Sequence, residues 1–208
     1  TFNFAHCYSD WFYTTFSASS QRCGRSRRLL GQGRGALDVP AGIKILRDHK
    51  TMGYRPDSHL LGNRICAHAA GKPARHATQT TGSLLAHLRR DRQTCFVTGT
   101  AAPCTSLFKP VRVAENMLPP IGPVPARNYD PRSLWWQHEN LHRSVLLDHS
   151  KRLDTYSSAR DELEDLWISR AIAAGNDQCR ELTRNAFGQA RAKTEEWTAV
   201  VQSLHPLI

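Results

Sequence analysis

The stretch that most constrains the fold is TCFVTGTAAPCTSLFKPVRV, residues 94–113. A short β-branched run at 95–98 enters a loop of small and hydroxyl residues at 99–106, and a second run at 108–113 leaves it. Runs of four to six β-formers bounded by Gly and Pro are typical of strands. The stretch therefore predicts two strands joined by a loop. Such a loop often carries binding groups, although its simpler interpretation is an ordinary strand connection rich in turn formers.

A second hydroxyl-rich stretch, QTTGSLLAHL at 79–88, precedes this one and is separated from it by a charged turn at 89–93. The connection is too short for a crossover, so residues 80–88 and 94–100 are predicted to pair as an antiparallel hairpin. This pairing places residues 79–83 beside the loop at 98–106. Two hydroxyl-rich ends are therefore expected to meet at one edge of a sheet.

The first third of the chain is predicted to be mainly helical. Aromatic residues at near-helical spacing in 2–16 indicate a buried helix, and an Arg-rich helix follows over 19–30. Asp38 is a suitable N-cap for a helix over 39–49, whose first turn tolerates a proline. Residues 65–70 are predicted to form a short strand.

The last third divides into a proline-rich segment and a helical tail. Residues 118–131 contain five prolines and are expected to run extended over the surface. From 132 to 174 there is neither Gly nor Pro, and apolar residues recur at helical spacing, which predicts one long helix. A turn at Gly175 precedes a second long helix over 177–204 that lies back on the first. We therefore divide the chain into 1–116, a linker at 117–131, and a helical hairpin at 132–208.

Composition limits the class of protein. With 208 residues, 40% hydrophobic and 22% charged, the chain suits one globular domain with a sizeable core, and no apolar run is long enough to cross a bilayer. The six cysteines lack C-x-x-C spacing, which argues against zinc ribbons and thioredoxin-like motifs. We expect reduced thiols and a cytoplasmic location. The net charge of +10 is concentrated in five arginines between 22 and 34. Because no aromatic residues are interleaved with them, a solvated helix face is favoured over a nucleic-acid interface.

The motif His138-Glu139-x-x-His142 matches the zinc-peptidase signature. Two histidines four residues apart share a helix face, and the glutamate would act as general base. A third ligand is harder to find on one continuous helix. His149 would lie about 10 Å beyond the second histidine, and Glu162 about 30 Å away. The alternative is that both histidines pack with neighbouring apolar residues against the following helix.

Three features together resemble the C-terminal half of the secernin and dipeptidase branch of the N-terminal-nucleophile (Ntn) hydrolases. They are QTTGS at 79–83, FVTGTAAPCTSLFKPV at 96–111, and LWWQHENLHR at 134–143 ahead of a helical tail. The TGT…SLFKP block is the most specific of them. SSQRCGRSRRLL at 19–30 and ILRDH at 45–49 fit the same order. The resemblance implies an α+β chain that forms part of a four-layer αββα fold with an antiparallel sheet.

The same resemblance implies hydrolysis of small peptides or amides, without a metal or other cofactor. In that family an N-terminal cysteine attacks the amide carbonyl, and its α-amino group, with a pKa near 8, acts as base. This chain begins with Thr1 in a segment that resembles mid-chain family sequence. We therefore expect the nucleophile on a segment absent from this chain, the N-terminal half of the same protein, and we expect this chain alone to be inactive.

The resemblance also identifies candidate site residues. Arg22 follows a Ser-containing stretch, as a supporting arginine does in the related bile-salt hydrolases and penicillin acyltransferases, and a guanidinium near a thiol favours the thiolate. Its alternative is a surface arginine of a basic helix. The residues expected to line a substrate pocket are Gln79, Thr80, Thr98, Thr100 and Ser106. Cys104 has no base adjacent in sequence, so we interpret it as a pocket or structural cysteine.

Three hypotheses follow for the function. The first is the C-terminal part of a cysteine-type Ntn amidohydrolase, dipeptidase-like, with a small peptide as substrate. The second is a non-catalytic scaffold of the same fold. The third is a zinc metallopeptidase. We expect no membrane or nucleic-acid partner, and homo-oligomerisation remains open.

Overall fold

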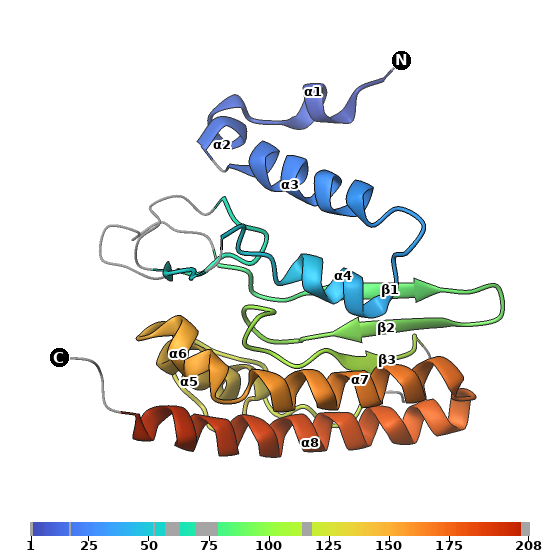
Figure 1. Cartoon of the computed structure of the whole chain (residues 1–208), viewed down its shortest axis with the longest axis vertical. Helices are drawn as coiled ribbons and strands as arrows, with labels where there is room; N and C mark the ends of the chain where they lie inside the picture. Colours follow the sequence, from blue (N-terminus) through green and yellow to red (C-terminus); the bar gives the residue numbers. More distant parts are fainter. Residues whose placement is uncertain are drawn as a thin grey trace.

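The computed structural model describes residues 2–16, 18–51, 53–56, 63–69, 79–113 and 118–204, except for the side chains of residues 5, 6, 13, 15, 16 and 176. It is an α+β structure with a three-stranded antiparallel sheet in the order β1-β2-β3 (Figure 1). The strands are β1 (Leu84–Leu88), β2 (Gln93–Val97) and β3 (Lys109–Val111). The helices are α1 (Phe4–Tyr8), α2 (Trp11–Phe16), α3 (Ser19–Gln32), α4 (Val39–Leu46), α5 (Leu134–Leu146), α6 (His149–Asp154), α7 (Ser157–Ala173) and α8 (Asn176–Ser203).

The predicted hairpin is confirmed. Strands β1 and β2 pair antiparallel with Leu84 opposite Val97, and β3 adds to the other edge of β2. The two hydroxyl-rich ends meet as expected, because the Thr98 N–H donates to the Ser83 carbonyl at 3.0 Å. Residues 79–83 run alongside the loop but lie outside the strand. The start predicted for the first strand was therefore too early.

One face of the sheet is covered by α4 and α7. Phe96 of β2 packs with Ile43 of α4 and with Ile168 of α7 in a buried cluster. Gly42 permits the close approach of α4 to β1, since a Cβ there would lie 2.1 Å from the Leu85 side chain. The predicted cap of α4 is confirmed, because the Asp38 carboxylate accepts from the backbone N–H of the first turn at 2.8 Å.

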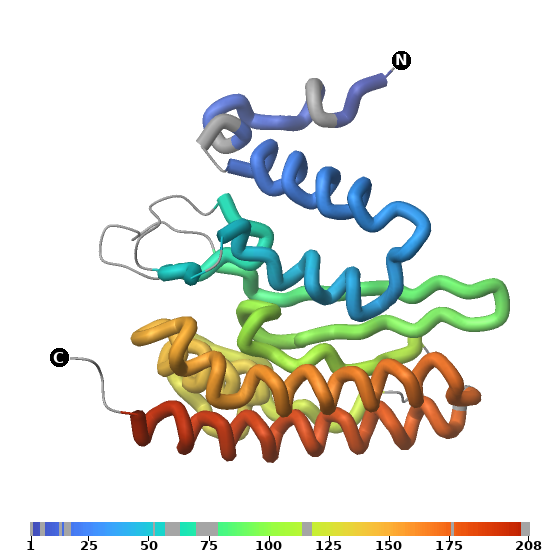
Figure 2. The backbone as a smooth tube through the Cα atoms, in the orientation of Figure 1, coloured from blue at the N-terminus to red at the C-terminus, as the bar shows by residue number. Residues whose placement is uncertain are grey.

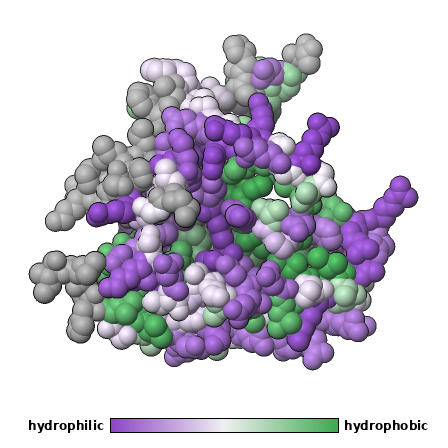
Figure 3. Space-filling model, viewed as in Figure 1, coloured by the Kyte–Doolittle hydropathy of each residue, from purple (hydrophilic) through white to green (hydrophobic). Residues whose placement is uncertain are grey.

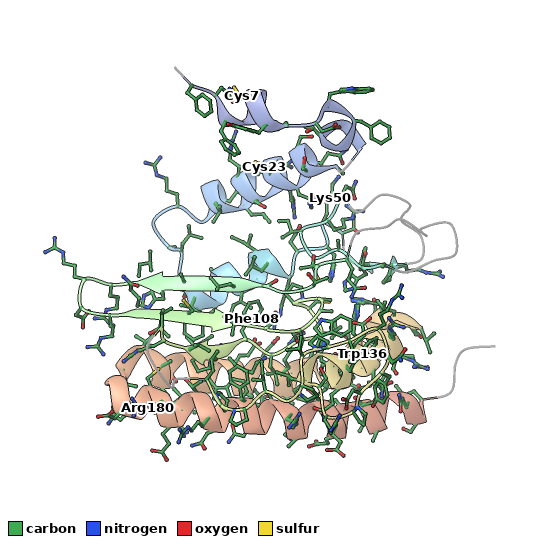
Figure 4. The ribbon with its side chains drawn as sticks, turned by 180° about the vertical axis from the view of Figure 1, so that it is seen from behind. Cys7, Cys23, Lys50, Phe108, Trp136 and Arg180 are labelled. Atoms are coloured by element: carbon green, nitrogen blue, oxygen red, sulfur yellow. The ribbon has the colours of Figure 1, made fainter. Side chains whose placement is uncertain are left out.

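The opposite face of β1 and β2 is apolar and largely uncovered. Cross-strand register places Leu84, Ala86 and Leu88 on this face together with Cys95 and Val97. Leu84 is 60% exposed and Leu88 71% exposed. Viewed from behind, no helix of the described residues lies in front of these two strands (Figure 4). The layer order in this region is therefore helix, then sheet, then an open apolar face.

A second core lies between α5, α7 and α8. Trp167, Trp197 and Tyr156 are buried in it, and the rings of Tyr156 and Trp197 stack with centroids 4.7 Å apart. Helix α8 also packs on β3, where Thr183 donates its hydroxyl to the Pro110 carbonyl at 2.9 Å. The predicted helical tail therefore packs on the sheet. Among the described residues, no helix has the length and apolar character needed to cross a membrane.

The single long helix predicted over 132–174 is wrong, because the chain folds there into α5, α6 and α7. The first break lies at Asp148, whose backbone leaves the helical region at φ −155° and ψ 80°. Arg152 of α6 donates to the carbonyl of Ser144 at 2.8 Å. This carbonyl is one of those at the end of α5 that have no N–H partner within the helix. The second break lies at Tyr156, whose ring enters the second core. Tertiary contacts, and not local propensity, decide both breaks.

A further prediction, at the start of the chain, is corrected. The buried helix over 2–16 is instead α1 and α2, whose aromatic side chains are exposed: Phe4 is 68% and Trp11 74% exposed. Helix α2 packs on α3, and α3 lies above the sheet and connects to it through α4 (Figure 2). Hydrophobic side chains are visible between the hydrophilic surfaces of α3 and α7 (Figure 3).

The strand predicted over 65–70 is also wrong for the described residues 65–69; residue 70 lies outside them. The Thr80 hydroxyl bonds to the backbone of this segment. It accepts from the Ala67 N–H at 3.0 Å and donates to the Ile65 carbonyl at 3.2 Å. Side-chain bonding to the backbone replaces a regular ladder here.

Candidate functional site

Three imidazoles and a thiol converge at one end of the sheet. They belong to His49, which follows α4, His68 in the segment 63–69, Cys104 in the β2–β3 loop, and His149, the first residue of α6. Their potential ligand atoms all lie within 4.8 Å of one another. We call these four residues the His/Cys cluster. His49 is half-buried and the other three are buried.

The contacts within the His/Cys cluster are short. The Nε2 atoms of His49 and His68 lie 3.0 Å apart. The Sγ atom of Cys104 lies 3.3 Å from Nε2 of His68 and 3.6 Å from Nε2 of His149. Tyr54 closes one side, because its ring stacks on His49 with centroids 4.3 Å apart and meets His149 edge-on. Burial raises the pKa of the Tyr54 phenol, which keeps it neutral.

A chain of hydrogen bonds reaches the cluster from α5. The Glu139 carboxylate lies 3.2 Å from Nδ1 of His142, and Nε2 of His142 lies 2.9 Å from Nδ1 of His68. Burial alone would raise the pKa of Glu139, but hydrogen bonds from His142 and Arg143 lower it to about 2. The carboxylate is therefore ionised at neutral pH. Gln79 donates to the same carboxylate at 3.3 Å.

The loop that carries Cys104 is held by two arginines. Arg47 donates to the Pro103 carbonyl at 2.9 Å and to the Ser106 carbonyl at 2.9 Å. Its guanidinium also forms a two-bond ion pair with Glu164 of α7, at 2.7 and 2.8 Å. Arg160 donates to the carbonyl of Cys104 itself. The position of the thiol is thus fixed through α4 and α7.

The two cysteines near the cluster differ in acidity. Burial would raise the pKa of Cys104, but hydrogen bonds from Cys66 and interactions with His68 and His149 lower it well below the usual range. The pKa of Cys66 is raised, first by burial and then by its hydrogen bond to Cys104. Cys104 is therefore the more acidic thiol of the pair.

The residues predicted to line a pocket have structural partners. Thr98, Thr100 and Ser106 are buried; the Thr100 and Ser106 hydroxyls lie 2.9 Å apart. Gln79 and Thr80 are half-buried. Gln79 donates to the Glu139 carboxylate, and Thr80 accepts from the backbone N–H of Ala67 in the segment 63–69. These five residues lie around the loop, as expected, and their role in binding stays a prediction.

Arg22 lies half-buried on α3. Another arginine of α3, Arg25, donates to both oxygens of Asp48, at 3.0 and 2.7 Å. Asp48 directly precedes His49 in the chain. The supporting role predicted for Arg22 remains a prediction from the resemblance.

The structure directs the two histidines of the His-Glu-x-x-His motif to different partners. Nε2 of His138 lies 3.1 Å from the Ser106 hydroxyl and 3.0 Å from the Thr105 carbonyl. Burial lowers its pKa to about 4. His142 instead links Glu139 to His68. Within the described residues, the two histidines do not share a group of three potential metal ligands.

Sequence reasoning missed His49, His68 and His149 because they are separated by long intervals. Neighbouring members of the cluster lie 19, 36 and 45 residues apart, which corresponds to no short metal-binding motif. His149 was placed too far along a continuous helix, and the break at Asp148 overturns that premise. The His-Glu-x-x-His motif does lie on a helix that contacts the cluster, since His142 of α5 bonds to His68.

Comparisons with models of known protein families, with curated proteins and with solved structures find no match for this chain.

Proposed function

We propose that this chain is one half of a cysteine-type Ntn amidohydrolase that cleaves small peptides, with its nucleophile on polypeptide outside this chain. The observation that carries the proposal is the open apolar face of β1 and β2. In a four-layer αββα fold, each sheet is covered by helices on one face and by the second sheet on the other. A chain with one helix-covered face and one uncovered apolar face matches half of that arrangement.

The composition of this face supports a second sheet as its cover. The side chains on it are Leu84, Ala86, Leu88, Cys95 and Val97, with Gln93 at one end. Solvated antiparallel sheets normally alternate apolar and polar residues, so that the outer face is polar. An apolar outer face instead indicates burial against another layer, because each exposed leucine would gain about 1.5–3 kcal/mol when covered.

The groups at the end of the sheet support the chemistry. The hydroxyl-rich loop at 98–106 and the segment that carries Gln79 lie at the same end of the sheet, where Thr98 bonds to Ser83 and Ala102 to Thr80. In the proposed reaction, a cysteine thiol of the second half attacks the amide carbonyl, and its α-amino group takes the thiol proton and delivers it to the leaving amine. Water then hydrolyses the thioester. This chain supplies the wall of the cleft.

The test is to produce this chain together with the polypeptide encoded upstream of it and to assay dipeptide hydrolysis. We expect activity only when both parts are present, and we expect iodoacetamide to abolish it. Leu84→Glu should weaken co-purification of the two parts. Leu147→Glu is the matched control, since Leu147 is 72% exposed on the α5–α6 connection, away from the sheet.

The other outcomes identify the alternatives. An assembled protein that hydrolyses no dipeptide would favour the non-catalytic scaffold. Activity of this chain alone that depends on Glu139 as general base would favour a zinc peptidase. Equal co-purification of the Leu84→Glu and Leu147→Glu variants would contradict the two-sheet arrangement itself.

A further inference from the structure

We infer that His49, His68, Cys104 and His149 bind one zinc ion, in a tetrahedral site that ties four segments of the fold together. This site goes beyond the proposed hydrolase, whose reaction uses no metal. Three imidazoles and one thiolate form a ligand set that Zn²⁺ accepts readily, and four protein ligands are typical of structural sites, because no coordination position is left open for substrate.

The spacing of the ligand atoms fits a tetrahedron around zinc. Zn–N bonds of about 2.0–2.1 Å and Zn–S bonds of about 2.3 Å give edges of about 3.3 Å between nitrogens and about 3.6 Å between nitrogen and sulfur. The His49–His68 distance is 3.0 Å. The two distances from the sulfur of Cys104 are 3.3 and 3.6 Å. These three edges are thus within about 0.3 Å of the expected lengths, and the other three edges are no longer than 4.8 Å.

Hydrogen bonding alone does not account for the convergence on His68. Its Nε2 atom lies 3.0 Å from the His49 nitrogen, 3.3 Å from the Cys104 sulfur and 3.5 Å from the Cys66 sulfur. An imidazole nitrogen carries either one proton or one lone pair, so it satisfies only one of these neighbours well. A single cation between the ligand atoms satisfies His49, His68 and Cys104 together.

The hydrogen-bond chain from α5 prepares His68 as a ligand. Ionised Glu139 accepts a hydrogen bond from Nδ1–H of His142, so Nε2 of His142 carries the lone pair. That nitrogen accepts from Nδ1 of His68, at 2.9 Å. The Nε2 atom of His68 is then left with its lone pair directed into the cluster. In metal sites the second ring nitrogen of a ligating histidine is commonly held by a hydrogen bond in this way; here His142 and Glu139 supply it.

Burial argues against Cys104 as a nucleophile. Its side chain is buried, and His68 and His149 lie against its sulfur. Zinc would instead bind Cys104 as the thiolate, with three neutral imidazoles, and leave the site with a net charge of +1. Cys66 would donate its S–H to that thiolate without binding the metal itself.

The experiment measures the metal content of the purified chain by mass spectrometry and follows titration of the metal-free protein with Co²⁺. We expect one zinc per chain. We also expect intense visible absorption from tetrahedral cobalt, together with a thiolate-to-cobalt charge-transfer band. Cys104→Ser should abolish the charge-transfer band, and His149→Gln should lower the zinc content at least tenfold. The matched controls are Cys95→Ser and His87→Gln, which change residues of the sheet outside the cluster and should retain the metal.

Substitution of His49, the half-buried ligand, keeps the test informative if the buried variants fail to fold. His49→Gln should bind Co²⁺ more weakly while retaining the wild-type circular dichroism spectrum. Wild-type protein with neither zinc nor a cobalt spectrum would overturn the inference. So would a Cys104→Ser variant that folds and retains the charge-transfer band.

This test is independent of the proposed hydrolase. Replacing zinc by cobalt or cadmium should leave thiol-dependent dipeptide hydrolysis by the assembled protein unchanged, because the metal takes no part in that reaction. Loss of hydrolysis with the metal retained would count against the hydrolase alone. Absence of the metal with hydrolysis retained would count against the zinc site alone.

Discussion

The ion pair between Arg47 and Glu164 should be the most sensitive polar contact in the fold. Glu164 is buried, with 3% of its side chain exposed, and it receives two bonds from Arg47, whose side chain is 14% exposed. The same carboxylate accepts from the backbone N–H of Phe108 at 2.7 Å. One side chain of α7 therefore holds α4 and the start of β3 at once.

Glu164→Gln changes the charge with almost no change of shape. The amide would retain one accepting oxygen, but its NH₂ group would face a guanidinium that can only donate. Arg47 would then be a nearly buried cation without its main partner, and removal of one member of a buried pair costs about 3–5 kcal/mol. Asp161, 3.3 Å from Arg47 and 54% exposed, offers partial compensation. We therefore expect a loss of about 3 kcal/mol, or about 6–12 °C in Tm for a chain of this size.

The assay is urea unfolding of the purified chain, followed by circular dichroism, with Glu196→Gln as the matched control. Glu196 of α8 pairs with Lys193 at 2.7 Å and is 56% exposed, and such surface pairs contribute about 1 kcal/mol or less. Equal losses of stability in the Glu164→Gln and Glu196→Gln variants would refute the larger contribution of the buried pair. A change in the urea m-value would show instead that the variant altered the extent of unfolding.

Three smaller predictions test the packing and the acid response. Asp38→Ala removes the cap of α4 and should cost about 1 kcal/mol in urea unfolding. Gly42→Val should cost about 1–3 kcal/mol because its side chain meets Leu85 of β1, whereas Gly24→Val, with nothing within 4 Å of its Cβ, should cost less; equal losses would contradict the close approach. Burial lowers the pKa of His138 to about 4, so the unfolded chain, with a histidine pKa near 6.5, binds more protons between these values. Stability should therefore fall by about 3 kcal/mol as the pH drops from 6.5 to 4, and His138→Gln should remove that part of the slope in unfolding measured at several pH values.

The parts of the fold that the sequence predicts are those with strong local patterns. The hairpin follows from two β-forming runs and a five-residue turn, and the cap at Asp38 follows from an acidic residue ahead of an apolar run. Helix α8 begins within one residue of its predicted start, after Gly175. In each case the local preference and the tertiary environment agree, so short-range reasoning suffices.

The parts that the sequence does not predict depend on contacts between distant segments. No Gly or Pro marks the breaks at Asp148 and Tyr156, which arise because Arg152 bonds back to α5 and the Tyr156 ring enters the core. The His/Cys cluster depends on the first of these breaks, since a continuous helix would carry His149 away from His68. Potential ligands that are closely spaced can be recognised in a sequence, whereas a cluster built from distant segments, like this one, cannot.

The break at Asp148 also has a consequence for biosynthesis. The chain is synthesised from its N-terminus. His49, His68 and Cys104 therefore leave the ribosome before His149, which lies 45 residues after Cys104 and completes the cluster. Until then, the exposed thiol and imidazoles stay open to oxidants and to foreign ions. Early maturation should therefore be the stage at which this protein is most vulnerable, and a chain interrupted between α5 and α6 should be a ready substrate for quality-control proteases.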